Sequence, residues 1–277
     1  MATATPEAEA TPAGDALEAR YREVLARIEA AARRSGRSGR EVILVAVTKH
    51  AGIEQIRRLL ELGHVDFGEN RLPVLQQHAA QVDEYLERVR TVPSAAPGDV
   101  PDRVRWHMIG HLQRNKVRKV LPLVRLVHSV DSLRLAEEIQ SVAATRMPEG
   151  TEIPVLVQVN AAEEKQKHGI APAAARHVVD QMETMFNLRI RGLMCMAPLT
   201  EDEDRVRSAF GRCRELFEDI RASGHAPRQF DLLSMGMSND YEIAIEEGAN
   251  LVRVGSAIFA EPDADPDGGV EPEGSAD

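Results

Sequence analysis

The amino-acid sequence predicts an α/β protein, a (β/α)8 TIM barrel with an extra N-terminal helix. Eight short apolar, β-branched runs alternate with helical segments over about 245 residues, a length typical of this barrel. No G-x-G-x-x-G turn follows the first predicted strand, and polar residues recur where the strands end. These observations favour the barrel over the alternative, an open doubly wound parallel sheet.

Apolar periodicity and end signals predict the helices. In the first helix, Leu17, Tyr21, Val24, Leu25 and Ile28 share one face, and the second helix closes on a glycine. The predicted helices are 15–37, 53–63, 71–90, 114–121, 132–147, 171–186, 203–223 and 239–248.

The strands are runs that are too short for helices, of which 41–49 (EVILVAVTK) is an example. The predicted strands are 41–49, 64–70, 103–110, 123–131, 154–160, 189–197, 229–237 and 250–260. A Pro/Gly-rich surface loop is expected over 91–102.

Composition limits the possible classes of protein. The hydrophobic fraction of 43% excludes general disorder, and no apolar run approaches the ~20 residues of a membrane span. The first 20 residues lack the pattern of a secretory signal, so we expect a cytoplasmic protein. Cys195 and Cys213 are expected to be free thiols in a reducing compartment. No cysteine spacing typical of zinc sites occurs, and no metal is expected.

The net charge of −10 is unevenly distributed. Seven acidic residues and no basic ones lie in 261–277, and two more acids lie in 1–14, so 15–260 carries a net charge of about −1. Such a body does not favour nucleic-acid binding. We expect 1–14 and 261–277 to be disordered tails, and 15–260 to be a single domain and a monomer.

In a (β/α)8 barrel the functional face lies at the carboxyl ends of the strands. The residues predicted there are Lys49, Gly68 to Asn70, His107 to His111, Ser129, Asp131, Asn160, Met194 to Ala197, Ser234 to Ser238, Gly255 and Ser256. Lys49 is one of only five lysines, and it is either an edge residue whose amine reaches solvent or a buried amine. A poorly solvated amine has a lowered pKa, and the neutral amine can form an imine with an aldehyde.

The loops after the seventh and eighth strands, 233–238 (LSMGMS) and 253–256 (RVGS), are where such barrels often bind phosphate. Their glycines allow close backbone approach, and their serines and arginine supply hydroxyls and charge. The residues concerned are Ser234, Gly236, Ser238, Arg253, Gly255 and Ser256. The alternative is an ordinary turn in which Ser238 caps the next helix.

Barrel closure would place the first strand beside the eighth, about 4.8 Å away. Lys49 and the two loops would then lie roughly 5–10 Å apart across the mouth of the barrel. A ligand with an aldehyde at one end and a phosphate at the other fits this span. Pyridoxal 5′-phosphate (PLP) is such a ligand.

Several segments resemble a known family, the PLP homeostasis proteins, which are single barrels similar to the N-terminal domain of alanine racemase. The resemblance covers about 17–260. The segments are VAVTK at 45–49, FGEN at 67–70, WHMIGHLQRNK at 106–116, QVN with K-x-G over 158–169, RGLMCMAP at 191–198, LSMGMSNDYEIAIEEGA at 233–249 and RVGSAIF at 253–259.

The resemblance implies that Lys49 holds PLP as a Schiff base, with Asn70 and His107 lining the ring or its approach. It implies that the phosphate is surrounded by Ser234, Gly236, Arg253, Gly255 and Ser256. Beside Trp106, His107 could instead be a packed core residue. Lys167 matches a lysine near the family's pocket, and it either contacts PLP transiently or is a solvated loop lysine. His50 departs from the smaller or hydroxylated residue expected after the lysine.

The resemblance implies a vitamin B6 carrier that binds PLP without amino-acid turnover and passes it to apo-enzymes. The alternative is a PLP-dependent racemase, which needs two bases on opposite faces of its substrate. In racemases the second base is a tyrosine from a C-terminal β-domain, whereas here only an acidic tail follows the last strand. Tyr21, Tyr85 and Tyr241 all lie on predicted helices. A barrel enzyme that binds phosphate without PLP would leave Lys49 unexplained.

Overall fold

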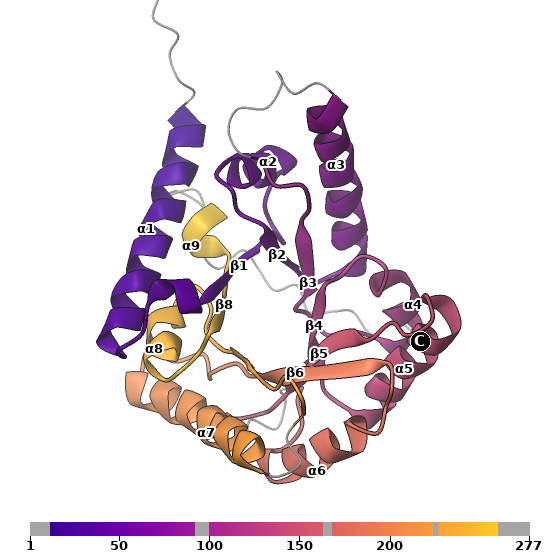
Figure 1. The fold of residues 1–277 in the computed structure, drawn as a ribbon. Coiled ribbons are helices and arrows are strands. Elements are labelled where there is room, and N and C mark those ends of the chain that lie inside the picture. The colour runs from indigo at the N-terminus through magenta and orange to yellow at the C-terminus, as the bar shows by residue number, and fades with distance from the viewer. Residues whose placement is uncertain (1–11, 92–99, 163–167, 224–226, 260–277) are drawn as a thin grey trace, which may run out of the picture.

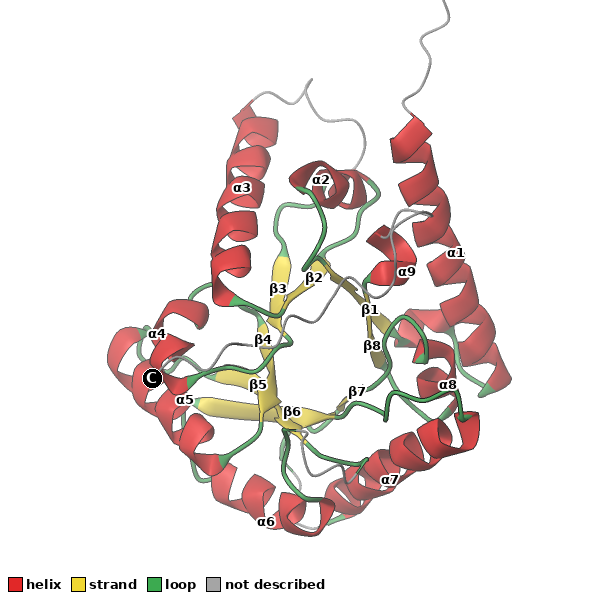
Figure 2. Cartoon of the chain, turned by 180° about the vertical axis from the view of Figure 1, so that it is seen from behind, coloured by secondary structure: helices red, strands yellow, loops and turns green. Residues whose placement is uncertain are grey.

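Eight parallel strands form a closed barrel in the computed structural model, which describes residues 12–91, 100–162, 168–223 and 227–259. The strands follow one another from β1 to β8, and β1 pairs with β8 to close the ring. Helices surround the strands on the outside (Figures 1 and 2). The predicted (β/α)8 barrel is therefore confirmed, and the open sheet is excluded because the first strand pairs with the last.

The strands are mostly shorter than predicted, because residues at their ends belong to loops. They are β1 (Ile43–Val47), β2 (Asp66–Glu69), β3 (Arg105–Met108), β4 (Leu126–Val130), β5 (Ile153–Gln158), β6 (Leu188–Met194), β7 (Leu232–Ser234) and β8 (Leu251–Val254).

The helices follow the predicted order. They are α1 (Pro12–Arg34), α2 (Ile53–Glu61), α3 (Leu72–Thr91), α4 (Val117–Val120), α5 (Leu133–Arg146), α6 (Pro172–Met182), α7 (Glu203–Ala222), α8 (Tyr241–Glu246) and α9 (Ser256–Phe259), with short 3-10 turns at Gly39–Glu41 and Arg114–Lys116. Helix α1 begins three residues inside the predicted N-terminal tail, since proline is tolerated in a first helical turn. The rest of that tail, the C-terminal tail and most of the predicted 91–102 loop lie outside the described residues.

The extra N-terminal helix α1 packs on the outside of the barrel against α8 and α9 (Figure 1). Arg20 Nε donates a hydrogen bond of 2.8 Å to the Ile258 carbonyl oxygen. The predicted eighth strand, 250–260, is wrong in its second half, because β8 ends at Val254 and α9 follows. Ile258 and Phe259 are buried. A short apolar run does not by itself distinguish a strand from a buried helical turn.

The buried apolar residues form two clusters. Inside the barrel lies a small cluster made of Val45, Leu126, Leu156, Met194, Leu232 and Leu251. A much larger cluster includes the apolar faces of the helices. Cys195 and Cys213 are free, as predicted, and both are buried. Within the described residues, no helix combines the length and apolar character needed to cross a bilayer.

Candidate functional site

Lys49 lies in a turn just beyond the carboxyl end of β1. Register pairs Ala46 with Val254, so this turn follows a strand that runs directly beside β8. A Cβ atom added to Gly255 would lie 3.1 Å from the Val47 carbonyl oxygen, which shows how closely the two strand ends approach. The predicted proximity of β1 to the loop after β8 is confirmed.

The expectation of a poorly solvated Lys49 is wrong, because the residue is exposed. Strand β1 stops at Val47, and Thr48 is the last buried residue before the chain turns outward. Lys49 and His50 are both exposed in this turn. Of the two interpretations of Lys49, the structure therefore favours an edge residue whose amine reaches solvent.

A buried cluster holds the base of this turn. The Thr48 hydroxyl donates a short hydrogen bond to Glu69 Oε1, and the Thr48 amide donates to the Gly68 carbonyl oxygen at 3.0 Å. His78 Nδ1 lies 2.8 Å from the same Glu69 oxygen, and the Glu69 side chain is fully buried. Glu69 thereby fixes the backbone that presents Lys49. Asn70, the next residue, is half-buried at the end of β2.

Ser238 links the two predicted phosphate loops. Its hydroxyl oxygen accepts hydrogen bonds from the amides of Gly255 (3.1 Å) and Ala257 (3.4 Å). Gly236 has a φ of +90°, and a Cβ there would lie 2.6 Å from the Ala244 Cβ, so the turn requires glycine. Ser256 is exposed at the start of α9. The loops after β7 and β8 thus meet beside β1, as the sequence predicts.

Five buried side chains form a hydrogen-bonded series inside the barrel, which we call the interior polar chain: Asp66, His107, His128, Ser234 and Arg253. His107 Nε2 lies 3.1 Å from Asp66 Oδ1, and His107 Nδ1 lies 2.9 Å from His128 Nε2. His128 Nδ1 lies 3.0 Å from Ser234 Oγ, to which Arg253 Nη1 donates a short bond. Strands β4 and β7 are not neighbours, so His128 and Ser234 meet across the barrel interior.

In the interior polar chain, each hydrogen bond is donated in the same direction, from Arg253 towards Asp66. Arg253 has only donors and the Asp66 carboxylate only acceptors, so Ser234 donates to His128, His128 Nε2–H donates to His107, and His107 Nε2–H donates to Asp66. Each imidazole then carries a single proton. Burial, together with the positive charge of Arg253, holds the pKa of His128 well below 6.5 and favours this neutral form.

Asp66 and Arg253, the two ends of the interior polar chain, have further hydrogen-bond partners. Arg105 donates to both Asp66 oxygens at 2.7 and 2.6 Å. Burial tends to raise the pKa of Asp66, but its bonds with His107 and Arg105 outweigh this and lower the pKa. At the other end, Arg253 Nη2 donates to the Cys195 carbonyl oxygen at 3.0 Å, and burial lowers the pKa of the guanidinium. The interior polar chain therefore joins the buried guanidinium of Arg253 to the buried carboxylate of Asp66.

The eight predicted site residues fall into two groups. At the mouth lie Lys49, Asn70, Gly236, Gly255 and Ser256. The other three, His107, Ser234 and Arg253, are buried members of the interior polar chain. His107 is thus the packed residue that the sequence left as an alternative. Lys167 lies outside the described residues.

Sequence reasoning missed Asp66 and His128 as site residues. Each is a polar side chain inside a strand with apolar neighbours, and that pattern was the available signal. Glu69 was placed at the end of the second strand, within the FGEN segment that carries the resemblance, but without a role.

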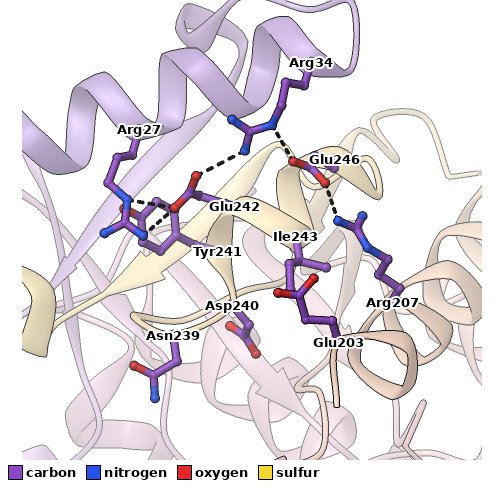
Figure 3. A pocket seen from close by; sticks show the side chains of 10 residues that line it. All are labelled: Arg27, Arg34, Glu203, Arg207, Asn239, Asp240, Tyr241, Glu242, Ile243 and Glu246. Atoms are coloured by element: carbon purple, nitrogen blue, oxygen red, sulfur yellow. Dashed lines mark hydrogen bonds and ion pairs between the residues drawn. The ribbon is translucent and has the colours of Figure 1, made fainter. Parts of the chain in front are cut away.

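A separate hollow of about 290 Å³ opens among α1, α7 and α8 (Figure 3), and Lys49 does not line it. Ion pairs cross it: Arg27 to Glu242 (2.5 Å), Arg34 to Glu246 (2.6 Å) and Arg207 to Glu246 (2.6 Å). Because its three arginines are paired with glutamates and two further carboxylates, Glu203 and Asp240, line it, this hollow is poorly suited to a phosphate.

Comparisons with known proteins agree with this geometry. Residues 20–262 match the family described as alanine racemase, N-terminal domain, which defines the class of barrel. Within this class, the chain belongs to the family of pyridoxal phosphate homeostasis proteins. The Helicobacter pylori protein of that name is 36% identical over 222 residues, covering 79% of this chain and 88% of its own length.

Two solved structures share the fold of this protein. A protein of unknown function from Bifidobacterium adolescentis is 35% identical with a TM-score of 0.79, covering 92% of this chain and 98% of that one. PipY from Synechococcus elongatus, solved with PLP bound, is 30% identical with a TM-score of 0.65, covering 85% of this chain and 99% of its own.

The residues at the mouth have the chemistry that PLP requires. Lys49 supplies an exposed amine for the aldehyde. The hydroxyl groups of Ser238 and Ser256 can donate hydrogen bonds to a phosphate dianion, whereas the Gly255 and Ala257 amides already donate to Ser238 Oγ. Gly255 leaves the backbone beside Val47 open to close approach. The donor set therefore fits the cofactor.

Proposed function

We propose that this protein binds PLP through an imine bond to Lys49 and serves in PLP homeostasis, without turning over amino acids. One observation carries the proposal: the turn of Lys49 lies beside the linked loops after β7 and β8. The family membership and the PLP-bound PipY structure support it.

Each residue group would have a separate task. Glu69 and Thr48 hold the base of the turn that carries Lys49. The Gly236, Gly255 and Ser256 segments would hold the phosphate, with Ser234 at the base of the loops. When bound, the cofactor supplies a reactive aldehyde, and Lys49 would keep that aldehyde from other amines. Delivery to apo-enzymes of PLP-dependent reactions is part of this proposal.

A racemase is the second candidate, because the family takes its description from alanine racemase. Such a reaction needs a second base opposite the lysine. Tyr21, Tyr85 and Tyr241 are all buried on helices outside the barrel. Tyr21 bonds to His64, and the Tyr85 hydroxyl donates to Glu61. None of the three therefore offers a phenol at the mouth, which favours the carrier.

Reduction with borohydride tests the proposal. The wild-type protein incubated with PLP should carry a reduced label on Lys49, identified by peptide mapping. Lys49→Arg should abolish the label, because a guanidinium stays protonated and is a poor nucleophile. Lys116→Arg, a change of another exposed lysine, is the matched control and should keep it. Stoichiometric label on Lys116, Lys119 or Lys165 of the wild type would contradict the assignment.

The phosphate loops have their own test. Ser238→Ala removes the acceptor that joins Gly255 to the β7 loop, and a lost hydrogen bond of this kind costs about 1 kcal/mol. We expect a roughly fivefold weaker affinity for PLP and a smaller preference for PLP over pyridoxal, measured by titration. Ser141→Ala, on an exposed face of α5, is the control. An unchanged preference in Ser238→Ala would place the phosphate elsewhere. Turnover of L-alanine by the holo-protein would favour the racemase.

A further inference from the structure

A second group of ligand-type side chains lies at the mouth, where β3, β4 and β5 end. His111 follows β3, Asp131 directly follows β4, and His168 lies in the loop after β5. His111 Nδ1 is 3.1 Å from Asp131 Oδ2, and His168 Nδ1 is 3.7 Å from the same oxygen. The two imidazole rings stack with centroids 4.2 Å apart. We call these three residues the rim triad.

The spacing of the rim triad suits a metal ion. One ligand atom from each residue lies within 4.8 Å of the other two. In a tetrahedral zinc site with ligands about 2.0–2.1 Å from the metal, neighbouring ligand atoms are about 3.3 Å apart. The two measured separations, 3.1 and 3.7 Å, bracket this value. The imidazoles of His111 and His168 are both exposed, so they have room to rotate until a nitrogen of each ring faces the metal ion.

The backbone beneath the rim triad is held in place. Gln158 Nε2 donates to the His168 carbonyl oxygen at 3.1 Å, and Ile170 pairs with Val159. Gly169, which lies between His168 and Ile170, has a φ of +130°, a backbone conformation that favours glycine. On the β3 side, a Cβ added to Gly110 would lie 2.2 Å from the Asn70 carbonyl oxygen. Tight packing thus fixes the segments on both sides of Asp131.

We propose that the rim triad binds one divalent transition-metal ion of the Zn²⁺ type. Two imidazole nitrogens and one carboxylate favour Zn²⁺, Co²⁺ or Ni²⁺ over the oxygen-preferring Mg²⁺ and Ca²⁺. Three protein ligands leave a coordination position for water or a small anion. The sequence predicted no metal, because that expectation rested on cysteine spacing, whereas these ligands come from three separate strand ends.

This site is distinct from Lys49. Strands β3 to β5 lie across the closed barrel from β8 and β1, which carry the proposed cofactor site. Metal binding and PLP binding can therefore be tested separately. The ion would tie together three loops of the mouth.

Equilibrium dialysis of the untagged protein against Zn²⁺ tests the proposal, with Co²⁺ as a spectroscopic probe. We expect one Zn²⁺ per chain and a visible Co²⁺ spectrum typical of nitrogen and oxygen ligands. His111→Gln, Asp131→Asn and His168→Gln should each weaken Zn²⁺ binding at least tenfold. His50→Gln and His177→Gln change exposed histidines outside the rim triad and should leave it unchanged.

Two outcomes would overturn the metal site. One is no binding at micromolar Zn²⁺, which would leave the rim triad as hydrogen-bonded side chains only. The other is equal binding by the triad variants and the wild type, which would indicate scattered surface histidines. Lys49→Arg should still bind Zn²⁺, and the triad variants should still be labelled by PLP at Lys49. Failure of the cofactor proposal is thereby distinguishable from failure of this one.

Discussion

The interior of the barrel and its outer surface use charged groups in opposite ways. Inside, Arg253 and Asp66 are joined through two imidazoles and a serine, and all five residues are buried. Outside, Arg27, Arg34 and Arg207 pair with glutamates of α8 (Figure 3). About half of the Arg34 side chain is exposed.

The two regions differ in the cost of losing a partner. Leaving a buried polar group without its hydrogen bond lowers the free energy of unfolding by about 1–3 kcal/mol. An exposed ion pair typically contributes only about 0–1 kcal/mol to it. The same residue types therefore matter for stability inside the barrel and very little on its surface. Three predictions test this difference in stability between the interior and the surface, from the largest expected effect to the smallest.

The largest effect is expected from His128→Leu. The substitution leaves the Ser234 hydroxyl proton and His107 Nδ1 without their hydrogen-bond partners in a buried position, so the free energy of unfolding should fall by about 2–5 kcal/mol. Urea denaturation measures it. Ser129→Ala is the matched control on the same strand, because the buried Ser129 hydroxyl has no hydrogen-bond partner among the described residues. Its removal should cost little, and a cost equal to that of His128→Leu would contradict the role of the chain.

A smaller effect is expected from pH, through His64. Burial lowers the pKa of His64 from 6.5 to about 4, and its ring bonds to Tyr21 and to the Asp66 carbonyl oxygen. Between these values the unfolded chain binds a proton that the folded protein does not, so stability falls as the pH drops below about 6.5. From pH 7.5 to pH 5 the loss from this group should be about 2 kcal/mol.

Urea denaturation at the two pH values measures this loss. His64→Gln should reduce the difference between them, while the buried His128 continues to contribute a loss of the same sign. His177→Gln, on the exposed side of α6, should leave the difference unchanged. A wild-type protein as stable at pH 5 as at pH 7.5 would show that these imidazoles are not held neutral.

The smallest effect is expected at the surface. Arg34→Ala removes two exposed ion pairs, with Glu242 and Glu246, and should lower the free energy of unfolding far less than His128→Leu, because water screens exposed charges. High salt should shrink the difference further, because mobile ions screen exposed charges. Thermal unfolding at low and high salt measures it. A loss as large as that of His128→Leu would erase the distinction between the two regions.

The architecture and the mouth of the barrel could be predicted from local sequence signals. Eight alternations of strand and helix specify parallel pairing, and closure then brings the end of β1 beside the loop after β8. Lys49, Gly236, Gly255 and Ser256 could be assigned to one face, because carboxyl ends of parallel strands meet at the same side. Local signals such as glycines and strand ends carry this information.

Which polar residues contact one another depends on the packing of segments that are distant in the sequence. His128 and Ser234 are 106 residues apart and on strands that do not pair, so no local pattern relates them. The same holds for His111, Asp131 and His168, whose side chains meet because three loops end at one rim. The exposure of Lys49 depends on where β1 stops. Strand periodicity assigns a side chain to a face, but its neighbours across a closed barrel follow from strand register and packing.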